Sequence, residues 1–279
     1  MGLKTMNDIV EIVNVNASKY LSANAITQVG TTKVRVIKQL AEGAYGIVFL
    51  AQDASGEASA TNTPPTSYAL KQLICQSKEQ VKDAHQELEV LKMFRGHPHI
   101  IQLIDHASNP LSSQNASSMS HREVMLLFPL CPRGTTWDAL LSADVLSAES
   151  TVPWPFNEQK ILYIIGCIAK ALQFMHDKGF SHRDVKPHNI LLSEPMINTA
   201  TSGSSRSEDY RLVGLPLLMD FGSVTAARVD IKTKSQGLNI EEEAASKTSA
   251  AYRQLLNFFF FLKIVNNIIL YDFAGVILF

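Results

Sequence analysis

The chain has 279 residues, of which 46% are hydrophobic and 18% charged, and its formal net charge is −1. This length allows one large domain or two ordinary ones, and the composition is that of a globular protein with a sizeable core. Because there is no excess of basic residues, the charge gives no electrostatic case for nucleic acid or an anionic membrane. We therefore expect no nucleic-acid partner.

The cysteines and the start of the chain bear on the compartment. Cys75, Cys131 and Cys167 are odd in number, widely spaced and free of any C-x-x-C pattern, so neither a disulfide framework nor a zinc site is expected. A reducing, intracellular compartment fits this usage. The first twenty residues contain no apolar run typical of a signal peptide. The Met-Gly start is that of an N-myristoylation signal, but Met6 stands where that signal has Ser or Thr.

Strand patterns dominate the first half of the chain. Segments 47–52, 68–74, 99–106 and 124–130 are apolar, with β-branched or aromatic residues, and are predicted strands. Apolar residues at helical spacing predict a helix over 78–94. Segments 53–67, 107–121 and 193–211 are rich in Ser, Thr, Gly, Pro and Asn. We interpret them as loop insertions and not as linkers between domains.

A long helix is predicted over 157–179, with Asn157 as its N-cap and Gly179 as its stop signal. Strands followed by a long helix indicate a sheet-rich lobe joined to a helical one, an α+β arrangement.

The segment "LAEGAYGIVFLAQD", residues 40–53, is a glycine-rich turn between two predicted strands. Alone it predicts a hairpin in which Gly43 and Gly46 supply positive φ. Lys71, inside the apolar strand "YALKQL", adds a second interpretation. An ammonium on a strand beside a glycine turn can pair with phosphates that approach the backbone N–H groups of the turn. An ordinary surface lysine is the alternative.

Two further motifs carry chemistry. "HRDVKPHN", residues 182–189, places Asp184, Lys186 and Asn189 in one short loop after the long helix. "LMDFGS" places Asp220 after another apolar strand. A general base, a cation and two oxygen ligands for Mg²⁺ are what in-line phosphoryl transfer requires, because the protein mainly positions groups and stabilises charge.

In the order of these motifs the chain resembles a eukaryotic protein kinase over about residues 34–253. The resemblance implies a bilobal α+β fold with a complete β-rich small lobe, and it implies ATP and Mg²⁺ as cofactors. Asp184 would accept the substrate proton with Lys186 as the second catalytic residue, while Asn189 and Asp220 would hold the metal ions. The residues implied to bind ATP are Leu40, Gly43, Gly46, Val48, Lys71, Glu87, Phe128 and Cys131.

Three details of this resemblance are specific. Glu87 would pair with Lys71, and Glu89 is the competitor for that role. Phe128 would be the gatekeeper, followed by backbone groups that face adenine. Ala41 departs from the family pattern, because it stands where the first glycine of the loop is expected. The residues that resemble the family's regulatory stack, or else are ordinary core, are Leu91, Leu103, His182 and Phe221.

The position of Lys186 is the serine/threonine form of the loop, so the expected partner is a protein with a Ser or Thr hydroxyl. Segments 126–141, 217–233 and 241–253 are similar to the numb-associated kinase family, nearest to its myristoylated and palmitoylated branch. No cysteine precedes Cys75, so palmitoylation near the start is not expected. The implied location is cytoplasmic, with peripheral attachment to internal membranes as the alternative.

The last residues, 254–279, do not continue the family pattern. We expect an N-terminal extension over 1–33, a kinase domain over 34–253 and an apolar tail over 254–279. The kinase domain is expected to be truncated in its activation segment, so that its helical large lobe is incomplete. A membrane anchor is one interpretation of the tail, but its longest uncharged run is nine residues, against about 20 needed to span. A core element is a second interpretation, and a segment foreign to the fold is the one we expect, because the resemblance breaks off abruptly at this point. Two functions stay open: a serine/threonine kinase, or an inactive truncated fragment that binds nucleotide or a partner.

Overall fold

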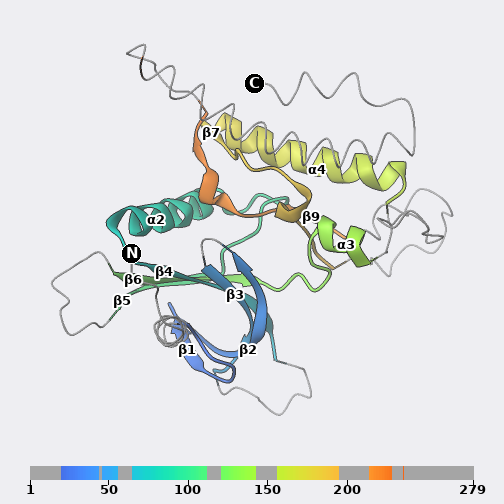
Figure 1. The fold of residues 1–279 in the computed structure, drawn as a ribbon. Coiled ribbons are helices and arrows are strands. Elements are labelled where there is room, and N and C mark those ends of the chain that lie inside the picture. The colour runs from blue at the N-terminus through green and yellow to red at the C-terminus, as the bar shows by residue number, and fades with distance from the viewer. Residues whose placement is uncertain are drawn as a thin grey trace, which may run out of the picture. The chain divides into compact units, whose positions relative to one another are not determined.

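The computed structural model describes residues 20–43, 46–55, 65–111, 121–142, 156–194, 214–227 and residue 235. The chain divides into two compact units. The first is Met1–Pro132 with Ser193–Thr199, and the second is Arg133–Leu192 with Ala200–Phe279. Figure 1 shows the elements of both units.

The first unit contains a six-stranded antiparallel sheet with the order β1-β2-β3-β4-β6-β5. β1 also contacts β5, the strand at the opposite edge, so the sheet curls until its two edges approach each other. The strands are β1 (Ile26–Val29), β2 (Thr32–Gly43), β3 (Gly46–Asp53), β4 (Ser67–Cys75), β5 (Asp105–Pro110) and β6 (Arg122–Pro129).

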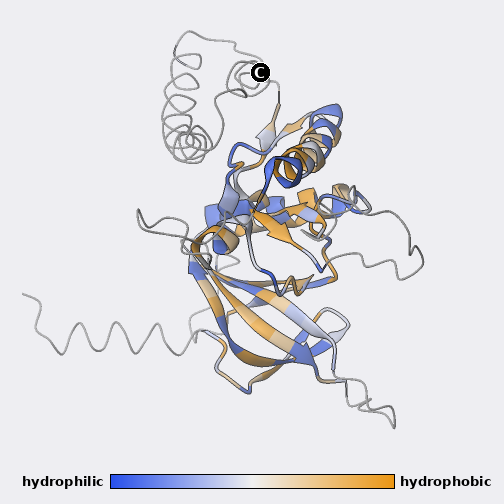
Figure 2. Cartoon of the chain, turned by 90° about the vertical axis from the view of Figure 1, so that its right-hand side faces the viewer, coloured by the Kyte–Doolittle hydropathy of each residue, from blue (hydrophilic) through white to orange (hydrophobic). Residues whose placement is uncertain are grey.

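The inner face of this curled sheet forms the core of the first unit. Successive side chains of a strand point to opposite faces, and alternate residues of β2, β3 and β6 are buried in one apolar cluster, together with Leu70 of β4. Figure 2 shows hydrophobic and hydrophilic residues following each other along these strands. The cluster consists of Val29, Val34, Val36, Ile47, Phe49, Ala51, Leu70, Met125 and Leu127.

One helix, α2 (Lys78–Met93), is described in the first unit and contacts β4 and β6. Ser77 begins it, because the Ser77 side chain accepts a hydrogen bond from Gln80 N at 3.2 Å. The helix buries the face that carries Ala84, Glu87, Leu88, Val90 and Leu91. Glu87 is the charged residue of that face, and it is paired, as shown below.

The second unit contains α3 (Thr136–Ser142) and α4 (Glu158–Asp177). α4 contacts β7 (Phe180–Ser181) and β9 (Pro216–Leu218). β7 pairs with β10 (Thr225–Ala226), and β8 (Ile190–Leu192) pairs with β9. Two short 3₁₀ turns, η1 (Pro187–Asn189) and η3 (Phe221–Ser223), lie between these strands and carry parts of the motifs 182–189 and 218–223.

Several predictions of elements are confirmed. The helix predicted over 157–179 is α4, with Asn157 as its N-cap, accepting from Lys160 N at 2.9 Å. Gly179 follows its end with φ +82°, which is the conformation that favours glycine. The predicted strands 47–52, 68–74 and 124–130 and the helix over 78–94 are also present. The expected division into a β-rich part and a helical part therefore holds.

The strand predicted over 99–106 is wrong for most of its length. Ile100 and Ile101 are buried outside any named strand, and β5 begins only at Asp105. β5 then continues to Pro110, through residues that were predicted to begin a loop. It is an edge strand that pairs on one side only, so polar side chains and a proline are tolerated there.

The expected domain start at residue 34 falls inside β2, because β1 and Thr32 already belong to the sheet. Tyr20 and Leu21 pack against the apolar cluster. Leu21 N also donates to Oε1 of the buried Gln72 at 3.1 Å. Of the described residues before 34, Ile26–Val29 and the first two residues of β2 therefore belong to the sheet.

The tail 254–279, the start of the chain and the tips of the three loop insertions lie outside the described residues. Of the helices that the structure describes, none combines the length and the hydropathy of a membrane-crossing helix.

Asp105 joins the edge strand β5 to the turn between β1 and β2. Its Oδ2 accepts from Thr31 N at 2.8 Å, Thr31 Oγ1 at 2.9 Å, Thr32 N at 3.1 Å and Thr32 Oγ1 at 2.9 Å. Gly30 turns beside it with φ +59°, where a Cβ would lie 1.9 Å from Asp105 Oδ1. Burial alone would raise the pKa of Asp105, but the hydrogen bonds from His106, Thr31 and Thr32 lower it.

Replacing Asp105 by Asn should lower the free energy of unfolding at pH 7 by about 1–3 kcal/mol, because a charged acceptor of several hydrogen bonds is lost. Urea titration measures this. The folded-state pKa of Asp105 lies below its unfolded value of 3.8, so the difference between variant and wild type should shrink as pH falls from 5 towards 3. Asp83→Asn, at an exposed position of α2, is the control. Equal stability of D105N and wild type at pH 7 would contradict this role.

Candidate functional site

Lys71 and Glu87 form an ion pair inside the first unit. Lys71 lies on β4 and Glu87 on the buried face of α2, and Lys71 Nζ lies 2.7 Å from Glu87 Oε1. The Lys71 side chain is 16% exposed and the Glu87 side chain 7%. Glu89, the competing candidate, pairs with Lys92 instead and is 67% exposed. The structure therefore distinguishes the two glutamates, while the phosphate role of Lys71 stays a prediction.

The register of the sheet places other predicted ATP-binding residues on the same face as Lys71. Val48 lies opposite Lys71, and Ala69, two residues before Lys71, lies opposite Phe128. Directly opposed residues and residues two apart share a face, so Val48, Lys71 and Phe128 lie on one side of the sheet. Leu70 and Leu127, which alternate with them, lie in the core cluster on the other side.

The glycine turn closes the β2–β3 hairpin, with Gly43 opposite Gly46. Gly46 has φ +143°, and a Cβ there would lie 2.2 Å from Gln72 O, so glycine is required. Gly43 is not among the residues with positive φ, which corrects that part of the expectation. Among the residues that the structure describes, a Cβ on Gly43 would meet no heavy atom within 4 Å. The packing of the described residues thus does not require glycine at this exposed position.

Two positions at the edges of this face are also predicted to bind ATP. Leu40 lies where the β2–β3 register shifts, and it is 45% exposed, which is unusual for a large apolar side chain. Cys131 follows β6 and is half-buried. Burial, with a smaller contribution from the negative charge of Glu194, raises the pKa of the Cys131 thiol from 9.0 to about 11. Ala41, the departure from the family pattern, pairs with Val48 as a regular strand residue.

In the second unit, the motif 182–189 forms the loop between β7 and β8. His182 is buried at its start, where Nδ1 accepts from Asp184 N at 3.3 Å. Nε2 therefore carries the proton and donates to Met219 O at 3.1 Å. Burial lowers the pKa of His182, so the ring stays neutral and links the loop to the residue before Asp220.

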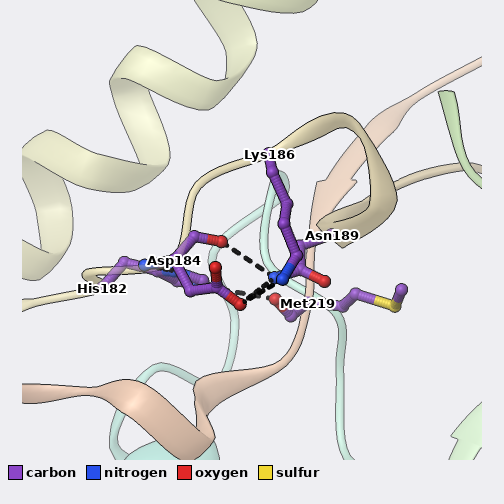
Figure 3. A network of polar contacts seen from close by, with 5 residues as sticks. All are labelled: His182, Asp184, Lys186, Asn189 and Met219. Carbon is purple, nitrogen blue, oxygen red and sulfur yellow. Dashed lines mark hydrogen bonds and ion pairs between the residues drawn. The ribbon is translucent and has the colours of Figure 1, made fainter. Parts of the chain in front are cut away.

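The Asp184 carboxylate is fixed through one of its oxygens. Oδ2 lies 2.8 Å from Lys186 Nζ and accepts from Asn189 Nδ2 at 2.9 Å. Asn189 Nδ2 also donates to Asp184 O at 2.8 Å. Figure 3 shows the three side chains converging on this point. The carboxylate can therefore not rotate without breaking charge-assisted contacts.

Two oxygens of this network are left for other partners. Within the part of the chain that the structure describes, Asp184 Oδ1 and Asn189 Oδ1 accept no hydrogen bond. Asn189 is only 4% exposed, and a buried oxygen without a partner is costly. An amide oxygen of this kind suits Mg²⁺, which prefers oxygen ligands.

Asp220 lies at the start of η3 in the left-handed region, with φ 64° and ψ 81°. Arg183, next to Asp184, also has φ 64°. Non-glycine residues with such backbone angles are uncommon and concentrate at functional sites. Phe221 packs its ring against His182, with centroids 5.3 Å apart. Asp220 thus directly follows Met219, whose carbonyl accepts a hydrogen bond from His182.

The oxygens that this site could offer a metal ion come from one carboxylate and one amide side chain. Among the described residues, no group of three or more His, Cys, Asp or Glu gathers at metal-binding distance. Mg²⁺ is usually bound by one or two carboxylates together with substrate phosphates. Asn189 and Asp220 can supply that kind of donor set in the second unit.

Sequence reasoning missed residues on α3 that contact this loop. Thr136 Oγ1 donates to Pro187 O at 2.8 Å. The Trp137 ring stacks on His188, with centroids 4.5 Å apart and planes at 23°. On the other side of the loop, Arg183 Nη1 donates to Thr225 Oγ1 at 3.2 Å. These contacts join residues far apart in the chain, so no local pattern could have identified them.

The pH dependence of stability should report on His182. The folded-state pKa of His182 lies below the unfolded value of about 6.5. As the pH falls through 6.5, His182 therefore becomes protonated in the unfolded chain before it does so in the native chain. The free energy of unfolding should therefore fall as pH drops from 7.5 to 5.5. His182→Gln should reduce that fall, measured by denaturant titration at each pH. His176→Gln, at an exposed position of α4, should keep the wild-type slope; an unchanged slope in H182Q would contradict the assignment.

The thiol of Cys131 should react slowly with iodoacetamide at pH 7.5, because the thiolate is the nucleophile and the pKa is raised to about 11. Mass spectrometry of the modified peptide measures the rate. Glu194→Gln should increase it, since the negative charge of Glu194 helps to raise the pKa. If Cys131 reacts as fast in the folded protein as in the denatured protein, the raised pKa of its thiol is contradicted.

Comparison with known proteins gives the family. The family model described as the protein kinase domain matches residues 34–238. A probable serine/threonine-protein kinase of Dictyostelium discoideum is 27% identical over 79% of this chain and 67% of its own. Human serine/threonine-protein kinase 16 is 28% identical over 67% of this chain and 50% of its own.

Serine/threonine-protein kinase ppk30 of Schizosaccharomyces pombe is 27% identical over 84% of this chain and 20% of its own. The chain thus spans about half the length of the human relative and a fifth of the yeast one. The family model matches well over half of the chain, in the region that contains the glycine turn, Lys71, the loop 182–189 and Asp220. The chain belongs to the protein kinase family.

Proposed function

We propose that this chain is the catalytic domain of a serine/threonine protein kinase, which transfers the γ-phosphate of ATP to a Ser or Thr hydroxyl of a protein. The observation that carries the proposal is the state of Asp184. The Lys186 ammonium and the Asn189 amide fix one carboxylate oxygen, Oδ2, while Oδ1 accepts no hydrogen bond within the described residues. A fixed carboxylate with one open oxygen is the geometry of a general base.

In this proposal Asp184 Oδ1 accepts the proton of the substrate hydroxyl. Lys186 stabilises the ionised carboxylate through Oδ2 and places a positive charge beside the reacting group. In the first unit, Lys71 is held by Glu87 and would pair with phosphate oxygens of the nucleotide. The absence of a side chain at Gly43 would let the backbone approach the phosphates closely.

The same residues support the proposed cofactors, ATP and Mg²⁺. Val48, Lys71 and Phe128, on one face of the sheet, would contact ATP, and Asn189 and Asp220 would hold Mg²⁺. When bound, the metal would neutralise charge on the phosphates. The unpartnered Oδ1 of Asn189 supports this, because it has no other use among the described residues.

We further propose that the chain is nearest to the numb-associated kinases, on the three segments quoted from its sequence, and that it is cytoplasmic. The three cysteines are free, and two of them, Cys75 and Cys167, are buried, which suits a reducing compartment. The alternative, an inactive fragment that binds nucleotide or a partner, lacks an observation of its own within the described residues.

Transfer of radiolabelled phosphate from ATP to a mixed Ser/Thr peptide library tests the proposal. Lys71→Met and Asp184→Asn should each lower the rate at least about 100-fold, because a positioned base or phosphate contact is lost. Lys92→Met and Asp177→Asn are matched controls at exposed positions outside the site, and they should stay within about twofold. Equal transfer by all five proteins would remove the catalytic assignment.

Thermal unfolding with and without Mg²⁺-ATP separates the inactive alternative. A ligand that binds only the folded state raises its stability, so wild type and D184N should both melt at higher temperature with nucleotide, and K71M less so. Nucleotide stabilisation without any phosphate transfer by wild type would favour the binding module over the enzyme.

A further inference from the structure

The start of α3 is attached to the loop of Asp184 by four contacts within the second unit. Thr136 Oγ1 donates to Pro187 O, and Trp137 stacks on His188. Leu192 N donates to Gly134 O at 2.9 Å. Thr135 and Leu191 form an isolated antiparallel bridge. The end of the loop, at Pro187 and His188, and the following strand β8 are therefore held by a segment about fifty residues earlier in the chain.

The position of α3 is itself fixed locally. Thr135 Oγ1 and Thr135 N both contact Asp138 Oδ2 at 2.8 Å, and Asp138 N donates back to Thr135 Oγ1 at 3.1 Å. This reciprocal arrangement is a capping box, which sets the first turn of a helix. Gly134 precedes it with φ +66°. Thr136 and Trp137 are thus presented to the loop from a defined turn.

The two loop residues that α3 holds lie between the two residues that fix the carboxylate. Pro187 and His188 contact Thr136 and Trp137. Their neighbours, Lys186 and Asn189, donate to Asp184 Oδ2. A shift of Pro187 and His188 would therefore move both donors, and with them the direction of Asp184 Oδ1.

Thr136 is the more specific of the two contacts. It is buried, and its hydroxyl donates to a carbonyl that also accepts from Ile190 N. A carbonyl has two acceptor sites, so Pro187 O can accept from both Thr136 and Ile190. Within the described residues, no other side chain is recorded as donating to Pro187 O.

We propose that Thr136, supported by Trp137, is a positioning residue for the phosphoryl-transfer reaction: it holds the turn Pro187–Asn189 so that Asp184 keeps its catalytic orientation. The inference rests on the proposed function. It assigns to α3 a role that acts through the loop, without contact to the reacting atoms.

Thr136→Val, which keeps the shape but removes the hydroxyl, is the main test. It should lower kcat about 10- to 100-fold, because small displacements of catalytic groups cost this much. KM for ATP should change by a smaller factor than kcat, since the proposed nucleotide contacts of Lys71 and Val48 are untouched and only the proposed metal ligand Asn189 lies in the displaced turn. Thr136→Ser retains the hydroxyl and should restore kcat to within about twofold of wild type. Thr27→Val, on β1, is the matched control and should behave as wild type.

A second variant keeps the test decisive if Thr136→Val fails to fold. Trp137→Leu removes the stack on His188 and leaves the buried hydroxyl, so kcat should fall by a smaller factor than in T136V, and by more than KM for ATP changes. Thermal unfolding of each variant shows that it is folded. Wild-type kcat in a folded T136V, or an equal loss in T136S and T136V, would overturn the proposal.

Hydrogen exchange gives a readout without turnover. The amides of Asn189 and Leu192 donate to Lys186 O and Gly134 O, so they should exchange faster in T136V and at the wild-type rate in T136S. If wild type transfers no phosphate, the proposed function fails, and this measurement still decides the positioning role. Unchanged exchange in T136V would overturn it independently of any activity.

Discussion

The contact on which the second unit depends is the ion pair and hydrogen bond at Asp184 Oδ2. Lys186 and Asn189 donate to the same oxygen from either side of one short turn. This places an ammonium, a carboxylate and a buried amide within a loop of eight residues. Charge-assisted contacts of this kind are shorter and stronger than neutral ones, so they define the direction of the remaining carboxylate oxygen. The proposed chemistry follows from that direction.

The backbone around this contact is held from several elements. Arg183 and Asp220 both adopt positive φ, which costs about 1–3 kcal/mol for each non-glycine residue. His182 bonds to Met219 O, and Arg183 bonds to Thr225, so each strained residue has a neighbour that is tied to the other segment. The contacts from α3 add a third attachment. These long-range bonds stabilise a loop conformation that the loop sequence alone would not keep.

In the first unit, the two faces of one curled sheet have different roles. Its inner face is apolar and supplies the core, while its other face carries Val48, Lys71 and Phe128 by register. A lysine on that second face is not left as a lone buried charge, because Glu87 on α2 compensates it. Asp105 ties the two edges of the sheet together at the β1–β2 turn. The strand register thus places the core residues on one face of the sheet and the candidate nucleotide contacts on the other.

The sequence by itself determined the features whose causes are local. Periodicity and capping predicted α2 and α4, and the motif 182–189 predicted Asp184, Lys186 and Asn189 as one group, because neighbouring residues in a short loop must lie close together. Only the tertiary structure decided between Glu87 and Glu89, added β1 to the sheet, moved β5 to Asp105 and brought Thr136 to Pro187. Each of these depends on a partner many residues away. Such partners are set by packing and register, which a single sequence does not display.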